Sequence, residues 1–148
     1  MLGALPVVDH FLGRLSLAEL LEEHVPEADP RVRLTTAKAI GVVVANLAIS
    51  HQPLYSMNEW AQGHDPAVLG LDPDEVGLVN DDRIGRALER LFEADRSSLL
   101  GRLALDAVAR FGIDCSELHN DSTSITLHGA YHYGEFSKMG VSSVAAAS

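Results

Sequence analysis

Residues 35–50 read TTAKAIGVVVANLAIS, and this stretch decides the fold. Thr35 or Thr36 can cap a helix over 36–50, because a threonine hydroxyl accepts a hydrogen bond from a free N–H of the first turn. Lys38 and Asn46 are the only clearly polar residues in the interior of the stretch. A helix that is apolar on nearly every side must be surrounded by other elements. The sequence therefore predicts a helical domain built around a buried central helix.

Two helices are expected before this central helix. Pro6 suits the first turn of a helix, and apolar residues follow it at helical spacing. Ser16 and Glu19 form a capping-box pattern that opens a second helix, which Pro26 ends.

Three more helices are expected after the central one. Ser56 and Glu59 form another capping-box pattern, at the start of a short helix through Trp60. The glycines and prolines of residues 64–79 indicate turns with a helical turn or two.

The last two helices are predicted over 81–93 and 97–111. Asn80 is positioned to cap the first of them, and Ser97 or Ser98 the second. Gly112 is a typical residue for the end of a helix.

The charge of the chain limits the classes of partner that it can have. The chain has 148 residues, enough for one domain, and 21 acidic residues against 11 basic ones give a formal net charge of -10. This balance argues against a polycationic nucleic-acid coat or a basic membrane-surface peptide. The only positive stretch is 83–110, with a net charge of +2.

Three arginines in this stretch are candidate DNA-binding residues. They are Arg83, Arg86 and Arg90, on the face of the 81–93 helix opposite its apolar residues. Guanidinium groups bind phosphates well, and two helices joined by a short turn permit a helix-turn-helix arrangement. The alternative is a solvated polar face on which these arginines pair with Glu89, Glu93 and Asp95.

Cysteine content and hydropathy indicate a soluble, reduced, cytoplasmic protein. Cys115 is the only cysteine, so a disulfide within the chain is excluded, and we interpret it as a small buried residue. The longest apolar run, residues 39–45, is far shorter than the ~20 residues that span a bilayer. The N-terminus shows no secretory signal pattern, and we expect no membrane partner.

The helical spacing of apolar residues is lost after residue 112. Residues 116–128 read SELHNDSTSITLH, and their serine, threonine and isoleucine content indicates short strands. The tail 137–148 has one charge and no periodicity, and we expect it to be disordered or to come from a shifted reading frame.

Three segments resemble the start of a bacterial insertion-sequence transposase. They are HQPLYSMNEWAQGHDPAVLGL, NDDRIGRALERLF and FGIDCSELHNDSTSITLHGAYHY, and the resemblance covers about residues 3–136. The class is the DDE transposases, in which a helical N-terminal domain of unknown function precedes an RNase H-like catalytic domain. The resemblance implies a mainly α chain, with a helical domain over 1–112 and then a short β-hairpin over 113–136 that starts an incomplete RNase H-like α/β fold.

The same resemblance assigns one catalytic position. Asp121 matches the first aspartate of the family's triad of two aspartates and a glutamate, which holds two divalent metal ions such as Mg²⁺. After Asp121 the only acidic residue is Glu135, so the second aspartate and the glutamate of the triad have no match. Two-metal phosphoryl transfer needs several carboxylates, and we therefore expect this chain to be a truncated, catalytically incomplete fragment with weak or absent Mg²⁺ binding. Spacing alone favours reading Asp121 as a turn or strand-end aspartate that bonds nearby backbone groups, and it is the resemblance that favours the catalytic position.

The histidines near Asp121 raise a weaker zinc hypothesis. His128 and His132 are four residues apart, and His119 is close by in the sequence. Histidines at that spacing suit a helix face, but Gly129 and the surrounding residues argue against a helix there.

Three functional hypotheses follow from the sequence. The first is a fragment of a DDE transposase, with Asp121 as its identifiable catalytic residue. The second is a non-catalytic helical module that binds transposon-end DNA, associates with itself, or pairs with a full-length transposase. The third is a decayed reading frame without a function.

Overall fold

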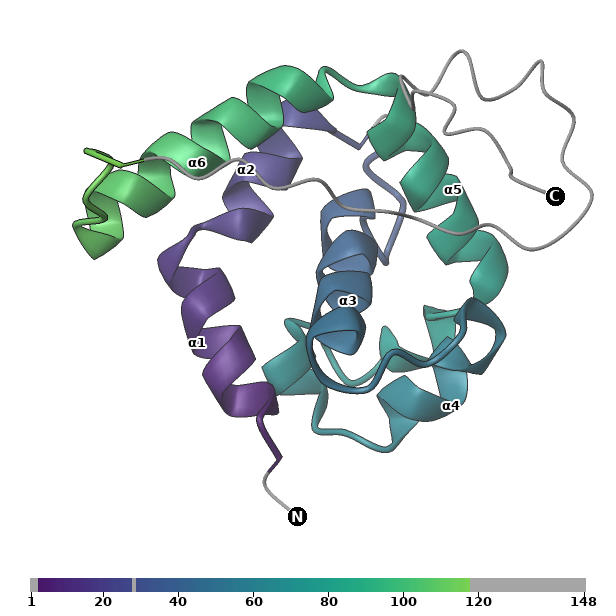
Figure 1. Ribbon diagram of the computed structural model, residues 1–148. Helices are drawn as coiled ribbons and strands as arrows, with labels where there is room; N and C mark the ends of the chain where they lie inside the picture. The colour runs from purple at the N-terminus through teal and green to yellow at the C-terminus, as the bar shows by residue number, and fades with distance from the viewer. Residues whose placement is uncertain (1–2, 28, 118–148) are drawn as a thin grey trace, which may run out of the picture. The chain divides into compact units, whose positions relative to one another are not determined.

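The fold of the chain was obtained as a computed structural model that describes residues 3–27 and 29–117 (Figure 1). The mainly α fold expected from the sequence is confirmed, and the described residues contain no strand. The α-helices in this part are α1 (Leu5–Arg14), α2 (Leu17–His24), α3 (Thr36–Ile49), α4 (Met57–Gln62), α5 (Asp81–Glu93) and α6 (Arg96–Phe111). Three 3-10 turns join them: η1 (Leu54–Ser56), η2 (Pro66–Leu69) and η3 (Val76–Leu78).

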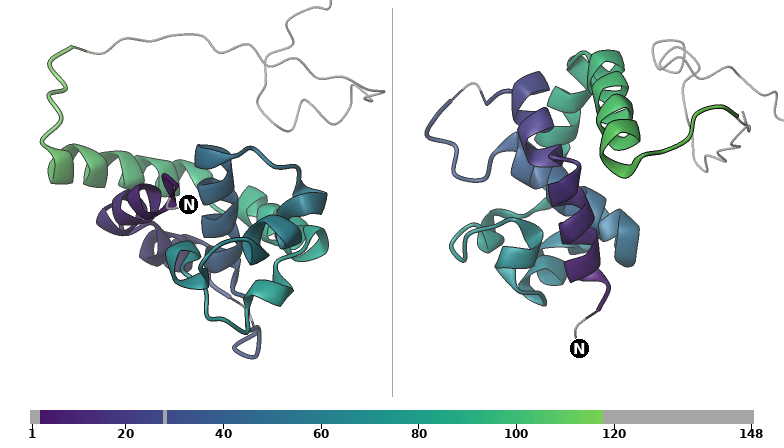
Figure 2. Two further views of the ribbon diagram at one scale, coloured as in Figure 1. Left: turned by 90° about the horizontal axis from the view of Figure 1, so that it is seen from below. Right: turned by 90° about the vertical axis from the view of Figure 1, so that its left-hand side faces the viewer.

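Helix α3 lies at the centre of the domain, as predicted from its composition. It packs against α1, α2 and α5, which surround it in Figures 1 and 2. Val42 in the middle of α3 is fully buried, and Ile84 of α5 and Met57 of α4 join it in one hydrophobic core. Because α1, α2 and α5 all pack against α3, residues on these separate helices that contact α3 are held in fixed positions relative to one another.

Some of the helix ends are capped by the residues that the sequence predicts. The Thr35 hydroxyl accepts a hydrogen bond from the N–H of Lys38 at 3.3 Å, and the Asn80 side chain accepts one from Arg83 at 2.8 Å. Both caps were predicted. Gly112, with a φ of 59°, ends α6 in the left-handed conformation that glycine adopts without strain.

Three predicted caps are wrong. Ser16 has a φ of 51°, and neither its side chain nor that of Ser56 accepts a capping hydrogen bond. Asp95 rather than Ser97 or Ser98 caps α6, by accepting a hydrogen bond from the N–H of Ser98 at 3.0 Å. Because Asp95 is the cap, α6 begins at Arg96, one residue earlier than expected.

Asn46 is the second polar residue of α3, and the structure gives it a role in a turn. It is 2% exposed. Its amide nitrogen donates to the carbonyl of Gln52 at 2.8 Å, and its amide oxygen accepts from the N–H of Gln52 at 3.0 Å and from the Ser50 hydroxyl at 2.8 Å. These bonds satisfy the buried amide and hold the chain as it leaves α3, including His51 with its φ of 53°.

Helix α6 lies along one margin of the described fold (Figures 1 and 2). Leu99 is its only buried residue. Cys115, which follows it, is exposed, so the prediction of a buried cysteine is wrong. Cys115 lies four residues past Phe111, the end of α6, where the chain no longer packs against the core. Most of the predicted hairpin, from residue 118 on, lies outside the described residues, as does the tail 137–148.

None of the helices in the described part of the chain is both long and apolar enough to cross a membrane.

Candidate functional site

Helix α5 carries the three arginines that the sequence predicts as DNA-binding residues. Ile84 and Ala87 are buried against the core, and this inner face fixes the rotation of the helix. The arginines do not share one environment. The side chains of Arg83 and Arg90 are 16% and 30% exposed, whereas that of Arg86 is 65% exposed.

Arg83 and Arg90 both bind Glu27, in the segment between α2 and α3. The Arg83 Nη2 lies 3.2 Å from Glu27 Oε2, and Arg90 donates to Glu27 Oε1. Each arginine also binds a backbone carbonyl: Arg83 Nε donates to Leu34 at 2.8 Å, and Arg90 donates to Pro26. Two guanidinium groups thereby clamp the segment that leads into α3 onto α5.

Glu27 also binds the first turn of α3. Its Oε2 accepts hydrogen bonds from the Thr36 N–H at 2.8 Å and from the Thr36 hydroxyl at 2.9 Å. Burial raises the pKa of Glu27, but the hydrogen bonds from Thr36 and the charges of Arg90 and Arg83 lower it more, so the pKa lies below its ordinary value of 4.5. The carboxylate stays ionised at neutral pH. We call Glu27, Thr36, Arg83 and Arg90 the Glu27 cluster.

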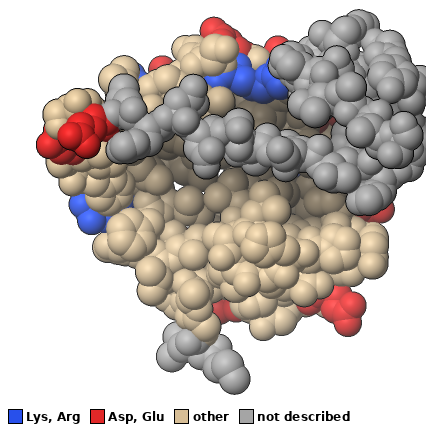
Figure 3. Space-filling model, viewed as in Figure 1, with Lys and Arg blue, Asp and Glu red and all other residues tan. Residues whose placement is uncertain are grey.

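The remaining arginines of the positive stretch are more exposed. Arg86 forms an ion pair with Asp82, and Arg102 with Asp106 at 3.2 Å. Arg96 stacks over the Phe92 ring, with 4.4 Å from its Cζ to the ring centroid. On the face shown in Figure 3, basic side chains are few and lie at the periphery, as acidic ones do.

The partners of the α5 arginines differ from those expected. The alternative drawn from the sequence pairs these arginines with Glu89, Glu93 and Asp95. The structure instead pairs Arg83 and Arg90 with Glu27, more than 50 positions away in the sequence. Periodicity located the face that carries these arginines, but nothing local in the sequence signals which acid they meet.

Lys38, the other polar residue of α3, joins a second ion-pair group. Its Nζ lies 2.6 Å from Glu75 Oε2 and 3.3 Å from Asp72 Oδ2. Glu75 is buried, and its Oε2 also accepts a hydrogen bond from the N–H of Asp72 at 2.8 Å. Burial lowers the pKa of Lys38, but the hydrogen bonds and charges of Glu75 and Asp72 raise it more, so it lies above its ordinary value of 10.5. This group anchors the 70–79 segment on α3.

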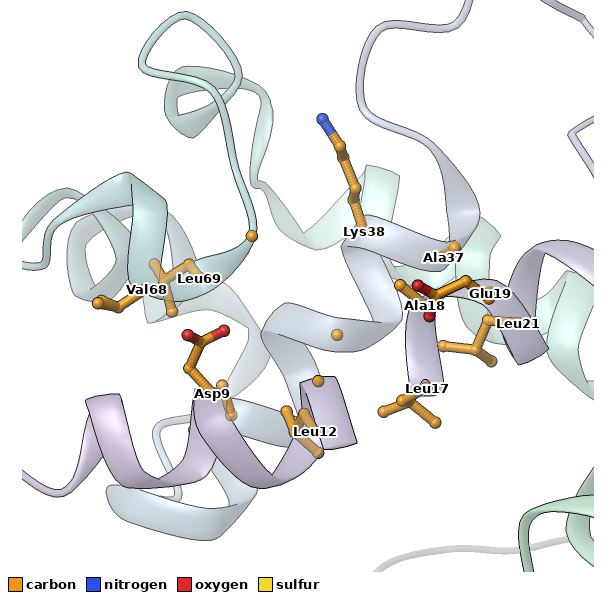
Figure 4. Close-up of a pocket in the computed structure, with 14 residues that line it drawn as sticks. Asp9, Leu12, Leu17, Ala18, Glu19, Leu21, Ala37, Lys38, Val68 and Leu69 are labelled. Carbon is orange, nitrogen blue, oxygen red and sulfur yellow. The ribbon is translucent and has the colours of Figure 1, made fainter. Parts of the chain in front are cut away.

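A cavity of about 190 Å³ lies between α1, α2, α3 and the end of η2 (Figure 4). Its lining is mostly apolar, with the carboxylates of Asp9 and Glu19 at the edge. Gly13 of α1 and Gly41 of α3 line it as well, and a Cβ added to either would meet no atom within 4 Å. The cavity has room for an apolar group of side-chain size. Lys38 also lines it, with its amine bound to Glu75 and Asp72, and no serine, threonine, cysteine or histidine is among its lining residues in the described chain.

Asp121, the metal ligand expected from the sequence, and the histidines of the weaker zinc hypothesis lie outside the described part of the chain. Asp121, His119, His128 and His132 all follow residue 117. Among residues 3–27 and 29–117, no group of three or more histidine, cysteine, aspartate or glutamate side chains is arranged to hold a metal ion.

Comparison with known proteins yields a family but no described activity. No curated protein and no solved structure matches the chain. Residues 1–105 match the family model described as Domain of unknown function (DUF4277). The match covers the helices from α1 to most of α6, the same residues that form the core. The chain therefore belongs to the DUF4277 family of domains of unknown function.

Proposed function

We propose that this chain is the N-terminal part of an insertion-sequence transposase of the DDE class, and that its helical part is a non-catalytic domain of that enzyme. One observation carries the proposal. The hydrophobic core is built from residues between Leu5 and Leu99, and α6 ends at Phe111, ten positions before Asp121. The helical fold is thus closed before the segment that resembles the first strand of the catalytic domain.

Asp121 has a specific role under this proposal. In the intact enzyme it would hold Mg²⁺ together with a second aspartate and a glutamate. Two ions held about 4 Å apart stabilise the attacking and leaving oxygens of phosphoryl transfer. A single aspartate offers one ligand of the six that Mg²⁺ requires, so we expect no DNA cleavage from these 148 residues alone.

The proposal is tested first on the DNA that follows the Phe136 codon. Translation of its three frames is expected to show, in one frame, further strands, a second aspartate and a glutamate on a helix. The insertion sequence that contains this frame is then assayed for transposition. The variants are Asp121→Asn and, as a matched acid-to-amide control, Glu117→Gln. Asp121→Asn is expected to reduce transposition to background and Glu117→Gln to leave it unchanged. The absence of such a frame, or normal transposition by Asp121→Asn, contradicts the proposal.

A second candidate function is DNA binding by the helical domain itself. It is favoured by the exposure of Arg86 on α5, within the only positive stretch of the chain. Arg83 and Arg90 are less suitable phosphate ligands, because both are bound to Glu27.

Arg86→Ala tests this candidate, with Arg31→Ala as the matched control. Both side chains are exposed and paired with a nearby aspartate, but Arg31 lies outside α5. Gel retardation at low salt is expected to weaken with Arg86→Ala only, and the slope of log K against log salt to fall by about 1 for one lost phosphate contact. Equal binding by the two variants contradicts DNA binding through α5. Substitution of Arg83 or Arg90 is a poor test, because it also removes a partner of Glu27.

A further inference from the structure

The cavity between α1, α2, α3 and η2 is large for a domain of this size (Figure 4). Protein interiors leave few voids larger than a water molecule, whereas this cavity has a volume of about 190 Å³ and a mostly apolar lining. In another protein, an apolar cavity of about 150 Å³ is enough to bind benzene. The cavity therefore has room for one aromatic ring with a short side arm.

Gly41 keeps one wall of the cavity open. It lies inside α3, where glycine destabilises a helix relative to alanine. Steric conflict does not require a glycine here, because an added Cβ would meet no atom within 4 Å. Gly13 of α1 also lines the cavity and has equally open surroundings. Two helices thus leave free the space that side chains would otherwise fill.

The charged groups of the lining select the class of ligand. Asp9 and Glu19 are exposed, and the ion pairs formed within the described residues use other acids. Lys38 is the only basic residue that lines the cavity in the described chain, and Glu75 and Asp72 bind its amine. In Figure 4 its side chain extends away from the other labelled residues. The edge of the cavity is therefore negative, and it attracts a cation and repels an anion.

The rim of the cavity favours a small molecule over a protein partner. The exposed residues of the lining are small or acidic: Asp9, Gly13, Ala18, Glu19 and Gly70. A protein that inserted one side chain would rest on this rim, which lacks the large apolar side chains that anchor protein interfaces. A small molecule that fits inside needs no contact beyond the cavity.

We propose that this cavity binds a small amphipathic cation, an amine whose apolar part is about the size of one aromatic ring. The apolar part occupies the space beside Gly41, and the ammonium group stays at the edge, where Asp9 and Glu19 attract it. Burial of the apolar part supplies most of the affinity, and the carboxylates supply selectivity, because partly exposed ion pairs contribute little. The site lies wholly within α1, α2, α3 and η2, so it does not depend on the transposase assignment.

Titration of the full chain with 2-phenylethylamine, followed by amide chemical shifts, tests the proposal. A ligand of this size is expected to bind with a dissociation constant of about 1 mM, and the shifts should saturate at amides of the cavity lining. The neutral 2-phenylethanol has the same ring and should bind ~3-fold more weakly. The anionic 3-phenylpropionate should bind more weakly still.

Removal of the carboxylates separates charge from shape. Asp9→Asn combined with Glu19→Gln should abolish the preference for the amine over the alcohol and leave the affinity for the alcohol unchanged. The matched control is Glu59→Gln combined with Glu93→Gln, which removes the same charge from exposed positions outside the cavity. This control should keep the preference for the amine.

Gly41→Leu tests the position of the apolar part. Its side chain should enter the cavity and weaken binding of both the amine and the alcohol by at least ~10-fold. Gly101→Leu is the matched control, because Gly101 is exposed on α6, outside the cavity, and an added Cβ there also meets no atom within 4 Å. Gly41→Ala should weaken binding while its denaturant midpoint rises, a combination that loss of folding does not produce.

Any of three results overturns the proposal: no saturable shifts at the cavity amides, equal affinity for the amine and the alcohol, or unchanged binding by Gly41→Leu. N-acetyl-lysine amide probes the other occupant, since it carries an apolar stem and an ammonium group on a peptide backbone. Tighter binding of this amide than of 2-phenylethylamine would overturn the choice of a small molecule in favour of a basic side chain of a protein partner. Weaker binding of it supports the small amine.

Discussion

Glu27 and Arg83 are 56 positions apart in the sequence, and their side chains form an ion pair with 3.2 Å between Oε2 and Nη2. The pair joins the segment before α3 to the first turn of α5. Because the same carboxylate oxygen binds the N–H of Thr36, one residue fixes the start of the central helix and the position of its main partner helix.

Glu27→Gln is expected to destabilise the domain by about 3 kcal/mol. The substitution leaves two partly buried guanidinium groups without their carboxylate, and removing one partner of such a buried pair costs more than the pair itself contributes. Urea denaturation followed by circular dichroism measures the loss. Asp29→Asn is the control, because Asp29 pairs with Arg31 at 44% and 89% exposure and should change stability by less than ~1 kcal/mol. Equal losses in the two variants would show that Glu27 is an ordinary surface acid.

The Glu27 cluster should also make stability depend on acid pH. The pKa of Glu27 is lower in the folded chain than its ordinary value of 4.5, so its stabilising effect is complete above that value and is lost as pH falls through the folded pKa. The free energy of unfolding of the wild type is therefore expected to approach that of Glu27→Gln below pH 4.5. Denaturant titrations of both proteins at neutral and acid pH check this. A constant difference between them at all pH values contradicts the assignment.

The fold could be predicted from the sequence because its signals are local. The apolar stretch around Val42 identified the central helix, and Thr35, Asn80 and Gly112 identified three helix ends. The Glu27 cluster could not be predicted, because it depends on how α5 docks on α3. Its members look like ordinary surface residues in a chain with 21 acids. Ser16 failed as a cap for a similar reason: the sharp turn from α1 to α2 places it in the left-handed region.

Asn46→Ala is expected to destabilise the domain by about 2 kcal/mol or more. The substitution leaves the N–H and the carbonyl of Gln52 without partners beside a buried site, and each lost buried hydrogen bond costs ~1 kcal/mol. Ser50→Ala removes only the hydroxyl bond to the Asn46 amide oxygen and should cost less than half as much. Thermal unfolding of the two variants and their double mutant measures the coupling. Stabilisation by Asn46→Ala would show that the core tolerates an apolar residue there.

Gly41→Ala and Gly70→Ala are expected to change the stability of the domain in opposite directions. Gly41 lies inside α3 at the edge of the cavity, where an added Cβ meets no atom within 4 Å. Alanine favours the helix by ~1 kcal/mol over glycine, so Gly41→Ala should stabilise the domain by about that amount. Gly70 ends η2 with a φ of 67°, a conformation that costs an alanine roughly 1–2 kcal/mol, and Gly70→Ala should destabilise by that much. Denaturant midpoints that shift in the same direction for both variants contradict this account, because the space around the two glycines is equally open and only the backbone conformation separates them.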